Sequence, residues 1–360
     1  MGMPMGFTLP VLRPDLDPLR PDQAPARARH EGRLIDSHGR QIRDVRLSIT
    51  DRCNFRCVYC MEPEDRFLPK MELLDLDEYL RLVDILVDLG IRTLRLTGGE
   101  PTLYPRLDEL IEGVGGRDLD DIAMTTNGSL LDRSRLERWL DDGLRRLTFS
   151  LDTLREDRMK TITRSRTTVS HVLESIELAR SAGFPRPKVN AVIIRGINDD
   201  EVGDFAELAR IMDLDVRFIE FMPLDSNRAW NRDHVVDADE MIAAIRARFE
   251  LRDDPNAPAH STSTNWTFAD GAAGRIGMIA PVSRPFCGAC NRLRVTAEGR
   301  IRPCLFSHEE WDVRSLLRGD EDDRAIGDAI VDMVWTKQAG HGIDQADFTQ
   351  PERTMSAIGG

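Results

Sequence analysis

Short stretches with a polar–apolar period of two alternate along the chain with longer stretches of helical period. In residues 45–50, Arg46 and Ser48 fall on one face of an expected strand, while Leu47 and Ile49 fall on the other. This pattern predicts a strand with one face against helices and the other toward a polar space. Further strands are expected at residues 92–96, 122–126, 146–151, 188–194 and 216–222.

Helical periodicity separates these strands. It is clearest where Tyr79, Leu82, Val83 and Leu86 recur at helical spacing before Gly90 ends the helix. Strand–helix alternation without hairpin signals predicts parallel strands joined by crossover helices. An open doubly wound sheet would bury apolar residues on both faces, so the polar face favours a barrel or part-barrel with a polar lumen. Other helices are expected near residues 105–112, 134–142, 169–182, 201–212 and 238–249.

The character of the sequence changes near each end, which predicts three regions. Residues 1–30 are rich in Pro, Arg, Asp and Ala without periodicity, so we expect a mobile N-terminal extension. Residues 31–237 hold the strand–helix units, and residues 238–360 hold a different C-terminal region. The sequence therefore predicts an α/β barrel domain followed by a smaller α+β domain.

Charge and composition restrict the partners. The 360 residues carry a net charge of −13, which does not favour nucleic acid or a membrane surface. No apolar stretch approaches membrane-spanning length, and the first residues lack the pattern of a secretory signal. The six cysteines form two groups in a long chain, so we expect thiols in a reducing cytoplasm.

The first cysteine group is Cys53, Cys57 and Cys60, with three residues between the first two and two between the last two. Tetrahedral zinc sites usually take their ligands as two short pairs, which fits a clustered trio poorly. A cubane iron–sulfur cluster takes one thiolate per iron, so three thiolates leave one iron open to a reactant. The spacing favours such a cluster, with a zinc knuckle or buried thiols as the alternative.

The second group is Cys287, Cys290 and Cys304, a pair followed by a single cysteine. This spacing is equally compatible with zinc and with an iron–sulfur cluster. His308 is the nearest histidine, but a lone histidine is more often an ordinary surface or packing residue. With no obvious fourth ligand, a second open-sided cluster is a reasonable expectation.

Basic residues gather on the expected lumen faces of this acidic chain. Arg292 and Arg294 share one face of a short strand that follows Cys290, and a solvated surface strand is the alternative. Guanidinium groups suit phosphate oxygens, so a nucleoside triphosphate would fit such a pocket. No phosphate-binding loop of the G-x-x-x-x-G-K-[ST] type occurs in the sequence. The other basic residues on lumen faces are Arg46, Arg95 and Lys188.

Two glycine-rich motifs have ordinary alternatives. Residues 97–101, Thr-Gly-Gly-Glu-Pro, would pass for a strand-to-helix turn, although glycine permits close approach and a carboxylate can hold an ammonium group. The chain ends in Ile358-Gly359-Gly360, which alone would suggest a frayed terminus. A slender tail of this kind could also thread into a crowded pocket.

Together these motifs resemble the GTP 3′,8-cyclase family of molybdenum cofactor biosynthesis, within the radical S-adenosylmethionine (SAM) superfamily. The first trio and Gly-Gly-Glu-Pro are shared across the superfamily. Three other features are typical of a much narrower group of proteins. They are the second trio, the Asn-Arg-Leu-Arg that follows Cys290 and the Gly-Gly terminus. The matching segments are residues 43–60, 95–102, 188–199, 217–224, 276–305 and 358–360.

The resemblance implies an incomplete (β/α)6 radical-SAM barrel and a C-terminal α+β domain with a second [4Fe–4S] cluster. It implies that Cys53, Cys57 and Cys60 hold the first [4Fe–4S] cluster and that Cys287, Cys290 and Cys304 hold the second. The implied SAM contacts are Tyr59, Gly99, Ser150 and Met222. The implied GTP contacts are Arg46, Arg95, Thr126, Lys188, Arg292, Leu293 and Arg294, and the implied catalytic residues are Gly359 and Gly360.

The implied reaction is that of a lyase. Reductive cleavage of SAM gives a 5′-deoxyadenosyl radical, which takes hydrogen from the ribose C3′ of GTP. The C3′ radical then attacks C8 of guanine, and the product is (8S)-3′,8-cyclo-7,8-dihydroguanosine 5′-triphosphate. A partner, cyclic pyranopterin monophosphate synthase, uses that product, and a homodimer is left open.

Two rival functions stay open on the sequence. One is a radical-SAM enzyme with an auxiliary cluster that acts on a peptide, which would more often have additional cysteines. The other is a non-catalytic iron–sulfur or zinc protein, which would bind metal without cleaving SAM.

Overall fold

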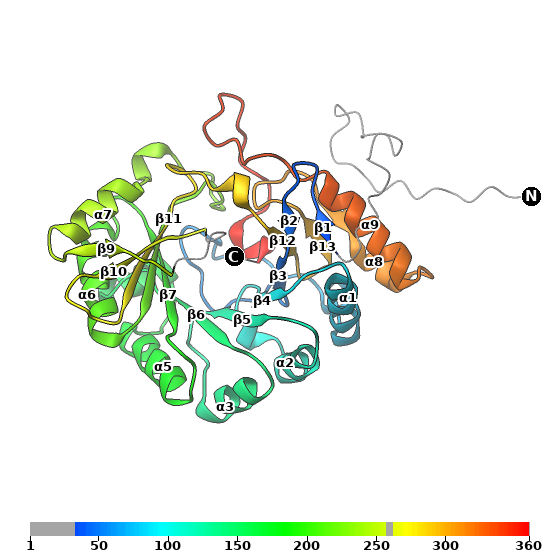
Figure 1. The fold of residues 1–360 in the computed structure, drawn as a ribbon, viewed down its shortest axis with the longest axis horizontal. Coiled ribbons are helices and arrows are strands. Elements are labelled where there is room, and N and C mark those ends of the chain that lie inside the picture. The colour runs from blue at the N-terminus through cyan, green and yellow to red at the C-terminus, as the bar shows by residue number, and fades with distance from the viewer. Residues whose placement is uncertain (1–32, 257–261, 360) are drawn as a thin grey trace, which may run out of the picture.

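The computed structural model describes residues 33–256 and 262–359 (Figure 1). The predicted mobile extension over residues 1–30 and the terminal Gly360 lie outside the described residues.

Six parallel strands form the curved centre of the molecule, and helices cover their outer side (Figure 1). They lie in sequence order, with each strand paired to the next. The strands are β3 (Asp44–Ser48), β4 (Thr93–Thr97), β5 (Asp121–Thr126), β6 (Arg146–Ser150), β7 (Lys188–Ile193) and β8 (Asp215–Glu220). The outer helices are α1 (Leu76–Asp88), α2 (Leu107–Gly115), α3 (Arg133–Asp141), α5 (Val169–Ser181) and α6 (Val202–Met212). The predicted incomplete barrel is confirmed.

Helix α1 shows how the sequence fixes these elements. The Asp75 carboxylate accepts a hydrogen bond from the Glu78 backbone N–H, and the Glu78 side chain accepts one from the Asp75 N–H. This capping box satisfies donors that the first turn would leave unpaired. The apolar stripe from Tyr79 to Leu86 is buried against the sheet. A further helix, α4 (Glu156–Thr163), was not predicted because its buried residues are few and widely spaced.

The C-terminal region extends both edges of the same sheet. Strands β9 (Leu251–Asp253), β10 (Thr264–Phe268) and β11 (Arg275–Ile279) continue from β8, and β11 runs parallel to it. Strands β12 (Arg292–Val295), β13 (Arg300–Arg302) and β14 (Trp311–Asp312) continue from β3, with β12 parallel to it. Outside the 12-stranded sheet lie a hairpin of β1 (Leu34–Ile35) and β2 (Gln41–Ile42), and the helices α7 (Ala238–Arg246), α8 (Val313–Arg318) and α9 (Asp323–Trp335).

Two groups of buried apolar residues hold this arrangement. The larger lies between the sheet and its helices and includes Leu47, Leu94 and Phe149. The smaller surrounds Ile358, which is fully buried next to the end of the chain. Burial of an isoleucine side chain contributes on the order of 2 kcal/mol, so the C-terminal tail is anchored inside the fold. Within the described residues, no helix is both long and apolar enough to cross a bilayer.

Candidate active site

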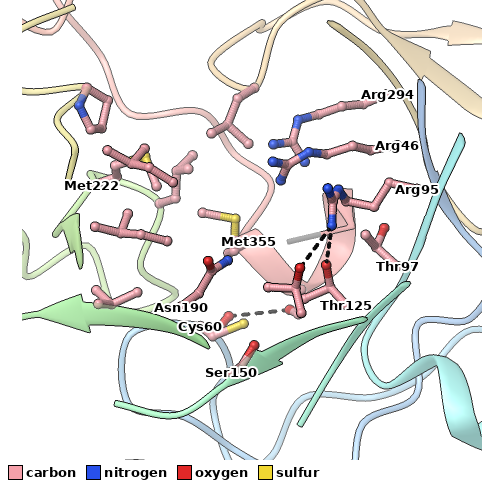
Figure 2. Close-up of a pocket in the computed structure, with 18 of the residues that line it drawn as sticks. Arg46, Cys60, Arg95, Thr97, Thr125, Ser150, Asn190, Met222, Arg294 and Met355 are labelled. Atoms are coloured by element: carbon pink, nitrogen blue, oxygen red, sulfur yellow. Dashed lines mark hydrogen bonds between the residues drawn. The ribbon is translucent and has the colours of Figure 1, made fainter. Parts of the chain in front are cut away.

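A cavity of about 300 Å³ lies inside the curved sheet, and all six cysteines line it. Figure 2 shows part of this lining, including Cys60. The expected polar faces of the strands point into it. Thr97 from β4, Thr148 and Ser150 from β6 and Asn190 from β7 are among its lining residues. The predicted polar lumen is therefore confirmed. Two cysteine groups separated by more than 200 residues meet at one cavity because β12 pairs directly with β3.

The first trio lies in the loop that follows β3. The Cys60 backbone N–H donates to the Cys57 carbonyl at 2.9 Å, and the Arg56 guanidinium donates to the Cys53 carbonyl at 2.6 Å. Burial raises the pKa of Cys53 to about 11. Burial and the charge of Cys53 raise the pKa of Cys60 to about 12. Three buried thiols that oppose one another's ionisation need added positive charge to exist as thiolates.

An iron–sulfur core is a group that supplies this charge, since metal binding deprotonates its thiol ligands. Within residues 33–256 and 262–359, no three His, Cys, Asp or Glu side chains are arranged so that they could bind one metal ion together. A cubane cluster instead takes one thiolate per iron, so its three ligands belong to three different metal atoms. Three thiols from one short loop match the ligand set of a cubane cluster in which one iron has no protein ligand.

In the second trio, Cys287 and Cys290 lie between β11 and β12, with Cys287 in a short 3-10 turn (Cys287–Ala289), and Cys304 follows β13. Burial alone would raise the pKa of Cys290, but Lys337 and the Arg292 backbone N–H bring it below its usual value. Burial raises the pKa of Cys287, which Cys304 raises further. The second trio thus lies in more positive surroundings than the first.

Arg40 ties the N-terminal hairpin to the loops of the second trio. Its guanidinium donates to the carbonyls of Cys287 at 2.8 Å, Ala339 at 2.9 Å and Gln338 at 2.7 Å. The Asp36 carboxylate accepts from its Nε at 2.6 Å, and both side chains are almost fully buried. This fork joins three parts of the chain at the second cysteine group.

We expect Arg40→Met to loosen the second metal site, because three carbonyls and the buried Asp36 carboxylate would lose their partner. The reconstituted variant should lose iron to a chelator several times faster from the second trio than the unaltered protein does. Iron release is followed optically, in a chain whose first trio is replaced by alanine. Arg43→Met, which removes an exposed pairing with Asp120, is the control. Equal release rates in Arg40→Met and the control would contradict this role.

Three arginines lie in register on neighbouring strands. Arg294 on β12 is opposite Arg46 on β3, which is opposite Arg95 on β4. All three are largely or fully buried and line the cavity, with their guanidinium groups directed into it (Figure 2). Like charges directly opposite one another destabilise a sheet. Such a row is typical of a site that binds an anion.

The pKa values of these arginines show the same repulsion between like charges. Burial, and then the charges of Arg294 and Arg292, lower the pKa of Arg46 well below its usual value. Burial lowers the pKa of Arg95 to about 10, and burial together with Arg292 lowers that of Arg294 to about 10. A bound polyanion would relieve the repulsion among them.

The residues expected to contact SAM all belong to the lining of this cavity. They are Tyr59, Gly99, Ser150 and Met222. A Cβ on Gly99 would lie 2.3 Å from the Arg52 carbonyl oxygen, so only glycine lets this turn approach the cysteine loop.

The Glu100 carboxylate serves a structural purpose as well. It accepts hydrogen bonds from the Thr126 hydroxyl at 2.7 Å and the Asn127 N–H at 2.7 Å, and also from the Thr102 N–H and hydroxyl. It therefore joins the ends of β4 and β5. Thr126, the expected GTP contact on β5, lines the cavity and is held in place by this carboxylate.

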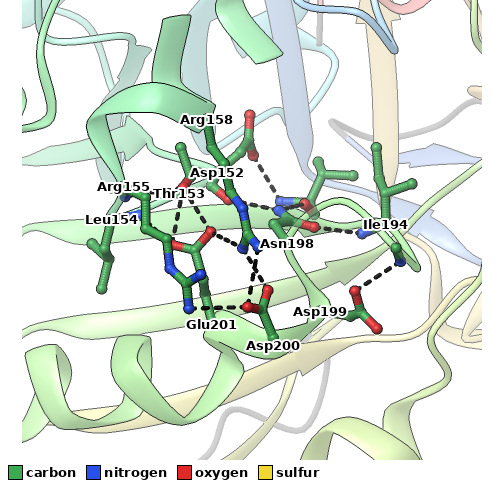
Figure 3. Close-up of polar contacts among 12 residues, drawn as sticks. Asp152, Thr153, Leu154, Arg155, Arg158, Ile194, Asn198, Asp199, Asp200 and Glu201 are labelled. Carbon is green, nitrogen blue, oxygen red and sulfur yellow. Dashed lines mark hydrogen bonds and ion pairs between the residues drawn. The ribbon is translucent and has the colours of Figure 1, made fainter. Parts of the chain in front are cut away.

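A second polar network fixes the ends of β6 and β7 (Figure 3). The Tyr59 hydroxyl donates to the Asp152 carboxylate at 2.7 Å, and burial raises the pKa of Asp152 to about 6. The Asn198 amide donates to the carbonyls of Asp152 at 2.6 Å and Val192 at 2.8 Å. Next to it, Glu201 accepts from Thr153 and Leu154 and pairs with Arg158. These contacts hold Tyr59 at the edge of the cavity.

The C-terminal tail enters this site. The Gly359 carbonyl accepts a hydrogen bond from Arg294 at 2.7 Å, and Gly359 has a φ of +71°. Upstream, Arg353 pairs with Glu298 at 2.5 Å and with Glu310 at 2.6 Å. The tail is thus attached at both ends to the part of the sheet formed by β12–β14. The reading as a frayed terminus is wrong for residues 353–359, because Ile358 is fully buried.

Some expected residues lie elsewhere. Lys188 begins β7 and lies 3.7 Å from Asp215, outside the lining of the cavity. Leu293 is buried in the large apolar core, on the opposite face of β12 from Arg292 and Arg294. His308, which was expected to be an ordinary surface or packing residue, contacts the Thr349 carbonyl and does not line the cavity. The expected metal ligands and the other GTP contacts do line the cavity: Arg46, Arg95, Thr126, Arg292, Arg294 and the six cysteines.

Sequence reasoning missed other lining residues. Arg217 on β8 lines the cavity, and burial lowers its pKa to about 10. Its position between Val216 and Phe218 has the same polar–apolar alternation as Arg46, so the pattern could have revealed it. Asn190 on β7 and Lys337 also line the cavity, and neither belongs to a motif that points to a function.

Comparison with known proteins identifies the family. Residues 47–209 match the radical SAM superfamily, and residues 214–343 match a family described as Molybdenum Cofactor Synthesis C. The chain is 45% identical to a GTP 3′,8-cyclase of Streptomyces coelicolor over 330 residues, covering 91% of this chain and 96% of the relative. This chain belongs to the GTP 3′,8-cyclase family.

Other relatives agree with this assignment. GTP 3′,8-cyclase 2 of Mycobacterium tuberculosis is 44% identical, and the GTP 3′,8-cyclase of Rhodopirellula baltica is 43% identical; each match covers 91% of this chain and 92% of the relative. Among solved structures, Streptococcus suis SuiB bound to S-adenosylmethionine has a TM-score of 0.57 at 13% identity, covering 87% of this chain and 68% of that one. That likeness shows the fold alone. Members of the family are radical SAM enzymes that use SAM and two [4Fe–4S] clusters, and this chain has a cysteine trio for each.

Proposed function

We propose that this chain converts GTP to (8S)-3′,8-cyclo-7,8-dihydroguanosine 5′-triphosphate, an early step of molybdenum cofactor biosynthesis. The observation that carries the proposal is the single cavity lined by both cysteine trios and by a row of buried arginines. A radical initiator and a polyanionic substrate would then share one enclosed space. Family membership at 45% identity over 91% of the chain supports the same activity.

Within this proposal the first trio would hold a [4Fe–4S] cluster and the second trio another, each with one iron lacking a protein ligand. A cluster held by Cys53, Cys57 and Cys60 would supply the one-electron reduction of SAM from which radical chemistry starts. Tyr59, Gly99, Ser150 and Met222 would orient SAM beside it, and Asp152 keeps Tyr59 in position.

The arginine row would bind the triphosphate. Arg46, Arg95 and Arg294 come from three neighbouring strands, so their relative positions are fixed by the sheet before the substrate arrives. Preorganised charges of this kind need little rearrangement when an anion binds. Arg292 extends the row toward Cys290, which would place the nucleoside between the two cysteine trios.

Gly359 and Gly360 would complete the site as the catalytic tail. Arg294 contacts the Gly359 carbonyl and lines the same cavity, so one guanidinium would link the tail to the substrate. Enclosure by the tail would also shield a radical from solvent, which radical chemistry requires.

The assignment of Lys188 to GTP predicts a pH dependence. Burial, and then Arg217, lower the pKa of Lys188 to about 7, while Asp215 opposes this shift. Below pH 7 the ammonium is present and would attract the triphosphate. Above pH 7 GTP binding would require uptake of a proton, so the Kd should rise by up to about tenfold per pH unit.

Calorimetry in two buffers of different ionisation enthalpy, between pH 7 and 9, measures this proton uptake directly. Lys188→Met should bind GTP more weakly at pH 7, and its Kd for GTP should no longer rise with pH. The exposed Lys160→Met, on α4, is the control. An equal pH slope in Lys188→Met and the unaltered protein would remove Lys188 from the GTP site.

The activity is tested by anaerobic reconstitution with iron and sulfide, followed by addition of SAM, reductant and GTP. We expect 5′-deoxyadenosine and a cyclised guanosine triphosphate in equal amounts, detected by mass spectrometry. Deoxyadenosine without consumption of GTP would contradict the cyclase and leave a radical SAM enzyme for another substrate, such as a peptide. Absence of SAM cleavage with both clusters formed would contradict radical SAM chemistry altogether.

The proposal includes the partners of this reaction. The cyclised triphosphate would pass to a cyclic pyranopterin monophosphate synthase, and the chain would work as a homodimer in the cytoplasm. The six free thiols support a reducing compartment, where disulfides are rare. Light scattering of the reconstituted protein tests the dimer, and production of the pterin when both enzymes are mixed tests the handover.

A further inference from the structure

A buried lysine lies beside the second cysteine trio and belongs to none of the expected site residues. Lys337 follows α9, and its side chain is 3% exposed. Its ammonium group donates to the carbonyl oxygen of Arg292 at 2.8 Å and to that of Pro303. The end of this side chain is therefore fixed by two hydrogen bonds.

Both carbonyls belong to the backbone that presents the second trio. Arg292 is the second residue after Cys290, and Pro303 immediately precedes Cys304. Lys337 also lines the cavity together with these two cysteines. One ammonium group thus joins two separate cysteine-bearing segments at the place where the metal centre would lie.

Carbonyl oxygens do not neutralise the charge of Lys337. Within residues 33–256 and 262–359, no carboxylate lies within ion-pair distance of it. An ammonium group buried without opposite charge is costly. A cluster with three thiolate ligands is an anion, because three negative ligands exceed the 2+ charge of the oxidised core.

The residues after Lys337 continue around the same trio. The carbonyls of Gln338 and Ala339 accept hydrogen bonds from Arg40, which also contacts the Cys287 carbonyl. Gly340 packs next to Cys287, where a Cβ would lie 3.9 Å from the sulfur. Residues 337–340 therefore contact the backbone beside two of the cysteines and the arginine that contacts the backbone of the third, and Lys337 is the charged residue of this segment.

We propose that Lys337 is the counter-ion of the second [4Fe–4S] cluster and a determinant of its reduction potential. Reduction adds one electron to the core and takes it from 2+ to 1+, so the centre gains a negative charge. A nearby fixed cation stabilises the reduced form more than the oxidised form. Lys337 would thereby raise the potential and keep the centre from losing iron. The inference rests on the cluster assigned to this trio.

The test is a redox titration of the second cluster by itself. Cys53, Cys57 and Cys60 are replaced by alanine in the full-length chain, which is then reconstituted anaerobically. The cluster is titrated with dithionite through redox mediators and followed by electron paramagnetic resonance, without SAM or GTP. In this background Lys337→Met, which keeps the length but removes the charge, is compared with Lys337→Arg. The exposed Lys160→Met is the control for loss of a lysine elsewhere.

We expect Lys337→Met to shift the equilibrium toward the oxidised cluster by at least about tenfold, which corresponds to about 59 mV for a one-electron couple. Lys337→Arg and Lys160→Met should stay near the unaltered potential. An unchanged potential in Lys337→Met would overturn the proposal, as would an equal shift in Lys337→Met and Lys337→Arg.

Iron content gives a second measurement if Lys337→Met does not hold its cluster. Loss of iron in Lys337→Met with retention in Lys337→Arg would support the counter-ion, because arginine keeps a positive charge at this position and methionine does not. Loss in both variants would show a packing role and overturn it. Since the titration uses no nucleotide, its result is independent of whether the enzyme cyclises GTP.

Discussion

Replacing Gly359 by alanine is expected to lower the rate of GTP cyclisation by about a hundredfold or more. A Cβ at this position would lie 2.7 Å from the Thr97 hydroxyl oxygen and 3.0 Å from Cβ of Ser48. Both neighbours belong to packed barrel strands, so the tail rather than the barrel would move. Displacement of reacting groups by about 1 Å can cost a factor of about 100 in rate. The Arg294 contact with the Gly359 carbonyl would be lost as well.

The matched control is Gly196→Ala. Gly196 has a φ of +76°, close to the +71° of Gly359, but a Cβ there meets nothing within 4 Å. In both variants the left-handed backbone conformation of alanine therefore destabilises the fold by a similar amount, roughly 1 kcal/mol. We expect Gly196→Ala to keep its activity, and Gly359→Ala to keep both clusters and its affinity for SAM. Equal loss of activity in the two variants would mean that backbone strain, not the position of the tail, explains the effect.

Replacing Arg292 by alanine is expected to raise the KM for GTP by about 10- to 100-fold, the range for one lost hydrogen bond to a charged group. Arg292 lines the cavity and lies on β12, two residues before Arg294 and two after Cys290. Its guanidinium donates to the Thr262 hydroxyl and lies over the Phe286 ring, so two contacts fix its position, and no carboxylate among the described residues pairs with it. Both cluster contents and SAM affinity should be unchanged, because the cysteines and the Arg292 backbone remain.

Arg252→Ala is the control for this variant, since Arg252 is an exposed arginine on β9 of the same sheet. It should leave the KM unchanged. Loss of iron from Arg292→Ala would contradict a substrate-binding role and place the side chain in the support of the second trio instead. A fall in kcat without a change in KM would mean that Arg292 acts after GTP has bound.

The barrel was predictable because its signals are local. Residues 45–50 alternate polar and apolar side chains, and Arg46 does point into the cavity while Leu47 is buried on the other face. The two cysteine trios were found for the same reason, since each is a short spacing in the sequence. That they meet at one cavity depends on the pairing of β12 with β3, which no local pattern indicates.

The remaining parts of the site depend on contacts between distant residues. Lys337 and Arg40 contact backbone carbonyls. Every residue has a backbone carbonyl, so these contacts cannot be recognised from the residue types of the acceptors. Lys188 has the right parity for the lumen but begins its strand, so it lies beside Asp215 rather than in the lining. The tail is buried through Ile358 and held by Arg353, although its final glycines alone suggest a loose end.

The central claim is that the cavity brings the ribose C3′ of GTP to the radical formed at the first trio. It is tested most directly with GTP that carries deuterium at C3′, incubated anaerobically with the reconstituted protein, SAM and reductant. The account predicts that the 5′-deoxyadenosine formed contains one deuterium and that the cyclised nucleotide has lost it. Unlabelled 5′-deoxyadenosine formed together with the cyclised nucleotide would contradict the account.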